Sequence, residues 1–290
     1  MTPEPRRVRL VRYDVPDGTV EIACAAPAAH LRAYVRDYVG WCDPSRAASR
    51  RRQVPSGRIP LIINFGARVR ERKARSDAWG EYGTFTAGLH DAFTITESAG
   101  PNVGMQINFS AIGARLFYDR PLRGLTNLTV ELGDVLNRQA DDLVSRLSDA
   151  PSWERRFTIV DAEIASRIAR AHAPSPTIIA THDELARTAG RVRIADLVRR
   201  AGWSERHLAT RFAEEIGLGP KAFARVLRFA AAVRALQKQG APNLADIALA
   251  CGYYDQAHFT REVVAFAGAT PTELLASRFP EDTGFRAAAR

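Results

Sequence analysis

The stretch Ile194-Ala195-Asp196-Leu197-Val198, followed by Ala201-Gly202-Trp203-Ser204, Leu208 and Phe212, occurs a second time further along the chain. The second copy reads Leu244-Ala245-Asp246-Ile247-Ala248, then Cys251-Gly252-Tyr253, Asp255, Phe259 and Val263. Gly202 and Gly252 lie 50 positions apart, but Leu208 and Phe259 lie 51 apart, so the second copy holds one extra residue after its turn. Two copies are too few for a solenoid and indicate two similar helical units in one domain.

Each unit predicts a helix, a tight turn and a second helix. The glycine suits the turn because it adopts a positive φ without steric cost. Ser204 in one copy and Asp255 in the other are N-cap residues for the second helix. Leu208 with Phe212, and Phe259 with Val263, have the i, i+4 spacing of a buried helical face. This is the helix-turn-helix arrangement, and the alternative is a plain helical bundle with accidental self-similarity.

A DNA-binding helix-turn-helix places its second helix in the major groove, with N-terminal residues facing base edges. Arginine suits guanine and glutamine suits adenine, whereas threonine contacts bases or phosphate. Glu205 also suits the dipole of its own helix, and phosphate contact or solvation competes evenly with base reading for Arg206 and Arg261. We expect Trp203 and Tyr253 to pack in the core. The predicted DNA-binding residues are Ser204, Glu205, Arg206, Ala209, Thr210, Arg211, Asp255, Gln256, Ala257, Thr260 and Arg261.

A third helix is predicted between the two units, from Pro220 to Lys238, with Gly240 and Pro242 ending it. Its nineteen residues would span about 28 Å, and one turn of B-DNA is roughly 34 Å. A rigid helix of this length would present the two units to successive major grooves on one side of a duplex.

The repeated stretch resembles the DNA-binding domain of AraC/XylS-type transcription regulators. The resemblance rests on Ile247-Ala248, Gly252-Tyr253, Phe259-Thr260-Arg261, Gly268 and Thr270-Pro271, and on Gly219-Pro220-Lys221 with Arg225 to Phe229. Two departures are Val263-Val264-Ala265-Phe266, where the family usually carries a basic residue, and Glu205 beside Arg206. The resemblance implies a sequence-specific regulator whose partner is a promoter or operator duplex, with RNA polymerase as a further partner.

The N-terminal part predicts short strands with turn residues between them. Expected strands are 8–11, 20–23, 60–65, 82–87, 92–97 and 103–109, with Ser110 capping a helix at 111–118. Arg68 to Asp77 reads as a basic loop, and Arg50-Arg51-Arg52 as a solvated loop or a contact for DNA or an anionic effector. This is the pattern of a small β-barrel or sandwich. It resembles, through Pro55-Ser56-Gly57 before an apolar strand and the helix after Phe109, the sensor domain found ahead of such DNA-binding domains.

The expected fold class is therefore α+β, with a β-rich domain followed by an all-α domain. Residues 1–130 form the expected β-rich sensor domain, and residues 131–172 a helical segment that packs on the barrel or pairs with a second subunit. Residues 177–280 form the expected double helix-turn-helix domain, after a linker at Ala173-Pro174-Ser175-Pro176.

Composition indicates which kind of partner and which cellular compartment to expect. The net charge is +9 with a pI near 10, which favours an anionic partner. Three cysteines without a CxxC motif argue against a disulfide framework or zinc site, and no histidines have metal-ligand spacing. With no apolar run near membrane length, we expect a cytoplasmic protein without a metal or cofactor.

Two other function classes stay open at this point. A catalytic N-terminal module fused to a DNA-binding tail would need a reactive cysteine, and Cys24 and Cys42 lie in no such motif. A protein–protein adaptor would use the helical repeat without binding DNA. We expect a regulator rather than an enzyme, with a small-molecule effector at the N-terminal domain and a homodimer as further possibilities.

Overall fold

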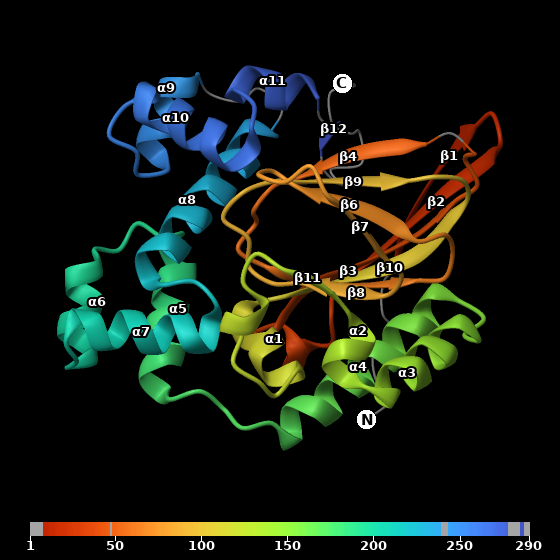
Figure 1. The fold of residues 1–290 in the computed structure, drawn as a ribbon, viewed down its shortest axis with the longest axis horizontal. Helices are drawn as coiled ribbons and strands as arrows, with labels where there is room; N and C mark the ends of the chain where they lie inside the picture. The colour runs from red at the N-terminus through yellow and green to blue at the C-terminus, as the bar shows by residue number, and fades with distance from the viewer. Residues whose placement is uncertain (1–7, 47, 239–242, 278–284, 287–290) are drawn as a thin grey trace.

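The computed structural model describes residues 8–46, 48–238, 243–277 and 285–286. The expected helix stop at Gly240 and Pro242 and the last three residues of the expected 177–280 domain lie outside the described residues. Two antiparallel sheets form the N-terminal half, and helices of the C-terminal half stand beside them (Figure 1). This confirms the expected α+β fold class.

The larger sheet has seven strands in the order β1-β2-β3-β10-β5-β8-β11. They are β1 (Arg9–Val15), β2 (Gly18–Ala25), β3 (Val35–Asp43), β10 (Asn102–Phe109), β5 (Ile59–Asn64), β8 (Phe85–Ala87) and β11 (Thr129–Glu131). The central strand β5 is buried along almost its whole length, whereas in β10 buried residues alternate with half-buried ones such as Gln106 and Asn108. Pro16 and Asp17 form the expected turn between β1 and β2.

The smaller sheet has five strands in the order β12-β4-β9-β6-β7. They are β12 (Phe285–Arg286), β4 (Ser49–Gln53), β9 (Thr94–Ser98), β6 (Val69–Lys73) and β7 (Trp79–Tyr82). Two predictions were wrong here, because β4 contains the arginine triplet Arg50 to Arg52 and β6 lies inside the expected basic loop Arg68 to Asp77. Glu97 of β9 lies between Arg50 and Arg70, with hydrogen bonds of 2.6 and 3.1 Å. Cross-strand charge pairing stabilises these strands without the apolar alternation that usually reveals one.

Helices α3 (Arg138–Ser148) and α4 (Trp153–Arg170) lie against the outer side of the larger sheet (Figure 1). Phe157 of α4 stacks on Tyr38 of β3 with ring centroids 5.5 Å apart, and Trp153 lies over Gly40. A Cβ at Gly40 would come within 2.3 Å of the Trp153 ring, so only glycine permits this contact. Of the two expected roles for this helical pair, the structure shows packing on the β-rich half, against the larger sheet.

Two short helices and two 3₁₀ turns complete this half: α1 (Ala111–Phe117), α2 (Leu132–Leu136), η1 (Ala29–Leu31) and η2 (Arg123–Leu125). Ser110 caps α1 as expected, accepting a hydrogen bond from the Gly113 amide. Among the described residues, no helix has the length and apolar character needed to cross a membrane.

The C-terminal helices form two groups at opposite ends of α8 (Pro220–Leu236), as Figure 1 shows. The first group holds α5 (Pro176–Arg187), α6 (Ile194–Ala201) and α7 (Glu205–Ile216). The second holds α9 (Leu244–Ala250), α10 (Gln256–Ala267) and α11 (Pro271–Ala276). One cluster of buried apolar side chains continues from the β-rich half into both groups.

Candidate nucleic-acid interface

The turn of the first helical unit has the expected geometry. Gly202 ends α6 with a φ of +67°, and the Ser204 side chain accepts a hydrogen bond from the His207 amide at the start of α7. Leu208 and Phe212 are buried under the helix. These contacts fix the angle between α6 and α7 and leave the opposite face of α7 toward solvent.

The second unit repeats this arrangement between α9 and α10. Gly252 has a φ of +82°, and Asp255 accepts a hydrogen bond of 2.6 Å from the His258 amide. Phe259 and Val263 are fully buried below α10. The two copies of the sequence pattern therefore form two copies of one structural unit.

Helix α8 joins the two units through its aromatic side chains. Phe223 contacts Phe212 of α7 at 5.9 Å between ring centroids, and Phe229 contacts Phe266 of α10 at 5.0 Å. Arg225 pairs with Glu262 of α10 at 2.6 Å. The helix has 17 residues and spans about 25 Å, two residues shorter than expected. Because α8 packs into both units, it acts as a rigid spacer between α7 and α10.

Most of the predicted DNA-binding residues lie on the solvent side of α7 and α10. Ser204, Glu205, Arg206 and Thr210 are exposed in the first unit, and Asp255, Gln256, Ala257 and Arg261 in the second. Ala209 and Thr260 are half-buried. Among the described residues, neither Arg206 nor Arg261 has an ion-pair partner, so both guanidinium groups are available to a ligand.

Arg211 differs from the other predicted contacts. It is half-buried, and its guanidinium group pairs with Glu214 at 2.6 Å and with Glu215 at 3.7 Å. The residue lies on α7 as expected, but its charge is already compensated by two carboxylates of the same helix. Its assignment as a DNA contact stays a prediction.

The aromatic residues after the turn glycines pack as expected. Tyr253 is 3% exposed and lies edge-on to His258, and burial raises the pKa of its phenol. Trp203 is half-buried and lies edge-on to His207 at 4.6 Å. Both side chains pack on the hydrophobic core next to the turns.

The sequence leaves Tyr254 ambiguous between core packing and a base contact, and the change of offset from 50 to 51 falls at this residue. Tyr254 follows Tyr253, precedes the cap Asp255, and is 90% exposed. It is therefore the extra residue of the second unit, and it places an aromatic ring beside the N-terminus of α10.

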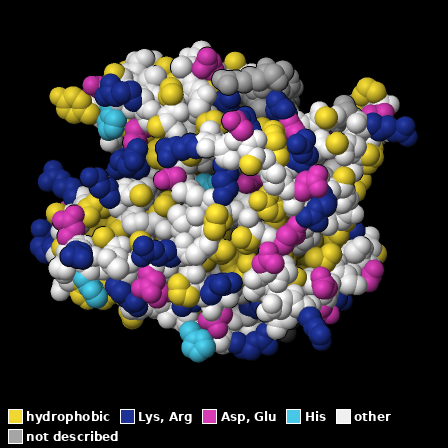
Figure 2. Space-filling model, in the orientation of Figure 1, with side chains coloured by type: hydrophobic (Ala, Val, Ile, Leu, Met, Phe, Trp, Pro, Cys, Tyr) yellow, Lys and Arg dark blue, Asp and Glu magenta, His cyan; other side chains and the backbone are white. Residues whose placement is uncertain are grey.

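Charged side chains lie densely over α6 and α7, at the left of the view in Figure 2. Arginines predominate there, but several are paired, such as Arg199 with Asp196 at 2.6 Å and Arg200 with Glu184 at 3.0 Å. The surface is thus a mixture of free and compensated cations.

Comparison with known families identifies the type of domain in the C-terminal helical half. Residues 197–277 match the family model described as "Helix-turn-helix domain". The chain carries an AraC-type helix-turn-helix domain. It is accordingly the chain of a DNA-binding transcription regulator, as the resemblance in its sequence implied. Residues 24–131 match a second family model, described as "Domain of unknown function (DUF6597)".

Several solved structures of regulators are similar to this chain at low identity. Unsaturated fatty acid bound wild-type ToxT from Vibrio cholerae strain SCE256 is 9% identical, with a TM-score of 0.48, over 83% of this chain and 95% of that chain. The AraC-like transcriptional activator CuxR is 14% identical, with a TM-score of 0.35, over 76% and 84%. The C-terminal domain of AraT, a response regulator from Geobacillus stearothermophilus, is 16% identical, with a TM-score of 0.34, over 37% and 88%. No curated protein sequence matches the chain.

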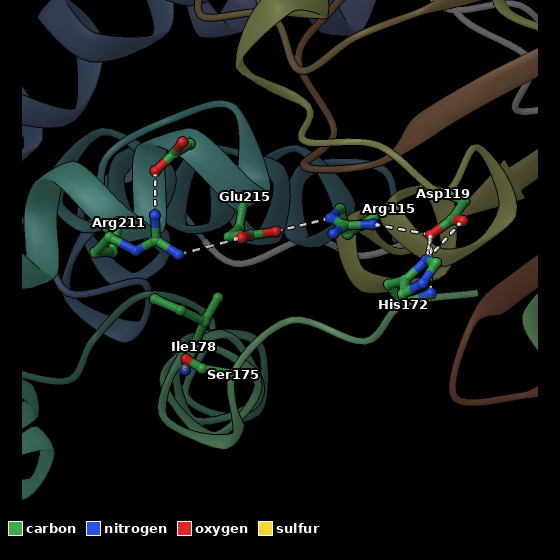
Figure 3. A network of polar contacts seen from close by, with 8 residues as sticks. Arg115, Asp119, His172, Ser175, Ile178, Arg211 and Glu215 are labelled. Carbon is green, nitrogen blue, oxygen red and sulfur yellow. Dashed lines mark hydrogen bonds and ion pairs between the residues drawn. The ribbon is translucent and has the colours of Figure 1, made fainter.

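The AraC-type domain contacts the β-rich half at the C-terminal end of α7. Arg115 of α1 donates a hydrogen bond to Glu215 at 2.7 Å, and Arg115 also lies 3.7 Å from Asp119 (Figure 3). The Asp119 carboxylate accepts hydrogen bonds from the His172 backbone and ring, which lower its pKa. Arg211, Glu215, Arg115, Asp119 and His172 thus form one chain of polar contacts across the two halves.

Proposed function

We propose that this regulator binds its promoter or operator in a sequence-specific manner, with α7 and α10 in successive major grooves. The observation that carries the proposal is the exposure of matching N-terminal faces on α7 and α10, held at the two ends of α8. The contacts from α8 to Phe212 and to Phe266 support a fixed spacing between the two faces.

Base reading in this proposal falls to four side chains. Arg206 and Thr210 act in the first groove, and Gln256 and Thr260 in the second. The caps Ser204 and Asp255 orient the first amides of each helix toward phosphates, and Arg261 contacts the backbone. The other predicted residues, Glu205, Ala209, Arg211 and Ala257, shape the two reading faces.

Selection of bound duplexes from a random pool tests this proposal with the full chain. We expect enriched duplexes with two short conserved blocks whose centres lie roughly 10 base pairs apart, about one helical turn. Recovery of the pool without enrichment would contradict sequence-specific binding. An adaptor that binds only protein would retain no duplex at low salt, where even non-specific binding persists.

We also propose that the β-rich half responds to a small-molecule effector. A hollow of about 560 Å³ opens between the end of α1 and the junction of α2 and α3. Tyr118, Asp119, Leu136, Arg138 and Arg167 line part of it, a mixture that suits a small anion with an apolar portion. Asp119 is also a member of the polar chain that ends on α7, which supports a coupling between this hollow and DNA binding.

Thermodynamic linkage between effector binding and operator binding provides a test of the effector proposal. Candidate small carboxylates would be screened for a change in the operator dissociation constant of the full chain. An effector that tightens operator binding by a given factor must itself bind the protein more tightly, by the same factor, when the operator is present. A carboxylate that binds the protein equally with and without operator would contradict its role as an effector.

The three-part division of the chain is a proposal as well. We propose a sensor at 1–130, a connecting segment at 131–172 and the DNA-binding domain at 177–280. Limited proteolysis that cuts first between residues 173 and 176 would support this boundary, and first cuts inside α4 or α5 would contradict it. Contact with RNA polymerase and pairing into a homodimer stay predictions.

A further inference from the structure

A groove of about 470 Å³ lies between the β-rich half and α7. Arg123 and Thr126 line it from the turn η2, and Ala209, Thr210, Ala213 and Gly217 line it from α7 and its end. Ala209 and Thr210 are also predicted DNA-binding residues. The groove therefore borders both the predicted reading face of α7 and a loop of the β-rich half.

Three contacts hold η2 and the preceding helix α1 against α7. The Thr126 hydroxyl donates a hydrogen bond of 2.8 Å to the Gly217 carbonyl, and the Leu122 amide donates one of 3.4 Å to the Glu215 carbonyl. The third contact is the buried Arg115–Glu215 ion pair of Figure 3. Gly217 has a φ of +104°, and a Cβ there would lie 3.1 Å from the Thr126 hydroxyl. The loop is thus held against the end of α7 through backbone groups and a buried charge pair.

The charges on α7 indicate which kind of ligand this groove could bind. The helix carries Glu205, Glu214 and Glu215 against two arginines, and Arg211 is paired with two of those carboxylates. Arg206 is the one arginine of α7 that has no ion pair among the described residues. Because phosphate contacts supply a large share of the affinity of DNA-binding proteins, cations on neighbouring elements would add to the single unpaired arginine of α7.

Arg123 is the cation of the β-rich half that lines this groove. Its side chain is exposed, and it has no ion-pair or hydrogen-bond partner among the described residues. The opposite wall includes Ala209, Ala213 and Gly217, none of which has a side chain larger than a methyl group, and this leaves room for a phosphodiester group. Thr126 of the loop covers this wall only at the Gly217 carbonyl, and Thr210, nearer the start of α7, is exposed.

We propose that Arg123 contacts a phosphate of the DNA strand that flanks α7, so that the β-rich half supplies part of the DNA interface. This inference rests on the proposed function, because it requires α7 to lie in the major groove. In this proposal η2 is a phosphate-binding loop, and the Arg115–Glu215 pair helps to position that loop.

The test compares Arg123→Gln with Arg120→Gln in the full chain. Arg120 is exposed, lies three residues earlier, and does not line the groove, so it controls for the loss of one positive charge. The probe is a mixed-sequence duplex of about 30 base pairs, roughly three helical turns. Its dissociation constant would be measured between about 50 and 200 mM salt.

For Arg123→Gln we expect the slope of log affinity against log salt to fall by about 0.9, because one phosphate is no longer neutralised. Affinity at 0.1 M salt should fall about 5- to 10-fold, equally on the mixed-sequence duplex and on selected duplexes. Arg120→Gln should retain the wild-type slope. Equal melting temperatures of both variants would show that the fold is intact.

An unchanged slope in Arg123→Gln, with wild-type protein that binds DNA, would overturn this contact and leave the proposed function standing. Tighter binding by Arg123→Gln would also overturn it, since η2 would then obstruct the duplex. Wild-type protein that binds no duplex at low salt would overturn the proposed function, and the contact with it.

Discussion

Arg115 of α1 and Glu215 of α7 form an ion pair with 2.7 Å between Nε and Oε2, and their side chains are 8% and 11% exposed. The two residues lie 100 positions apart and belong to different halves of the molecule. A charge pair with so little access to water depends on both partners, because either one alone would keep only a longer contact of 3.7 Å, Arg115 with Asp119 or Glu215 with Arg211.

Removing one member of this pair should therefore be costly. We expect Glu215→Gln to lower the free energy of unfolding by about 3 kcal/mol, since the buried Arg115 guanidinium would lose its shortest carboxylate contact. The double variant Arg115→Met, Glu215→Met should be closer to wild type because it removes both charges. Urea unfolding of the three proteins measures this, and a double variant that is less stable than Glu215→Gln would contradict it.

Two glycines with positive φ allow a matched comparison of strain and crowding. Gly202 has a φ of +67° with open space around it, whereas Gly190 has a φ of +74° and lies against the Ala224 carbonyl. Gly202→Ala should cost about 1–2 kcal/mol from the backbone alone. Gly190→Ala should cost about 1–3 kcal/mol more, because its Cβ would lie 2.1 Å from the Ala224 oxygen. Thermal unfolding of both variants is the measurement, and equal losses would mean that the Ala224 contact relaxes freely.

Arg206→Ala should weaken binding to the preferred duplex by about 1–3 kcal/mol and relax the preference at one base position. The reason is the bidentate fit of an arginine to guanine in the major groove. Binding to a set of single-base operator variants measures both effects. An equal loss on every variant would assign Arg206 to phosphate instead.

Glu71 gives a prediction about pH. It is buried, and desolvation raises the pKa of its carboxyl, while a hydrogen bond of 2.8 Å from the Thr129 hydroxyl acts in the opposite direction. An acid with a raised pKa in the folded state binds more protons there than in the unfolded state, so its contribution to stability falls as pH rises above the unfolded pKa. Glu71→Gln cannot ionise, and it should gain stability relative to wild type between mildly acidic and neutral pH. Urea unfolding at several pH values would show this, and a constant difference would contradict it.

The sequence was sufficient for features that depend on neighbours within one unit. The turn glycines, the caps Ser204 and Asp255, and the buried Phe212 and Phe259 follow from helix periodicity and capping chemistry, and the structure confirms them. These signals are local, so a single sequence contains all of them.

Features that depend on distant partners could not be predicted in this way. The strand β6 depends on Glu97 of another strand to compensate Arg70, and Arg115 gives no sign in the sequence of its contact with Glu215. The groove beside Arg123 exists only because η2 packs on the end of α7. Such contacts depend on how the two halves pack against each other. The periodicity of the sequence carries no information about that packing.

In the proposed complex α7 and α10 enter neighbouring major grooves on one side of the duplex. Methylation interference at guanine N7, a major-groove atom, tests this placement most directly on a selected duplex. We expect two groups of interfering guanines whose centres lie roughly 10 base pairs apart, on one face of the helix. A single group, or two groups on opposite faces of the helix, would contradict the claim.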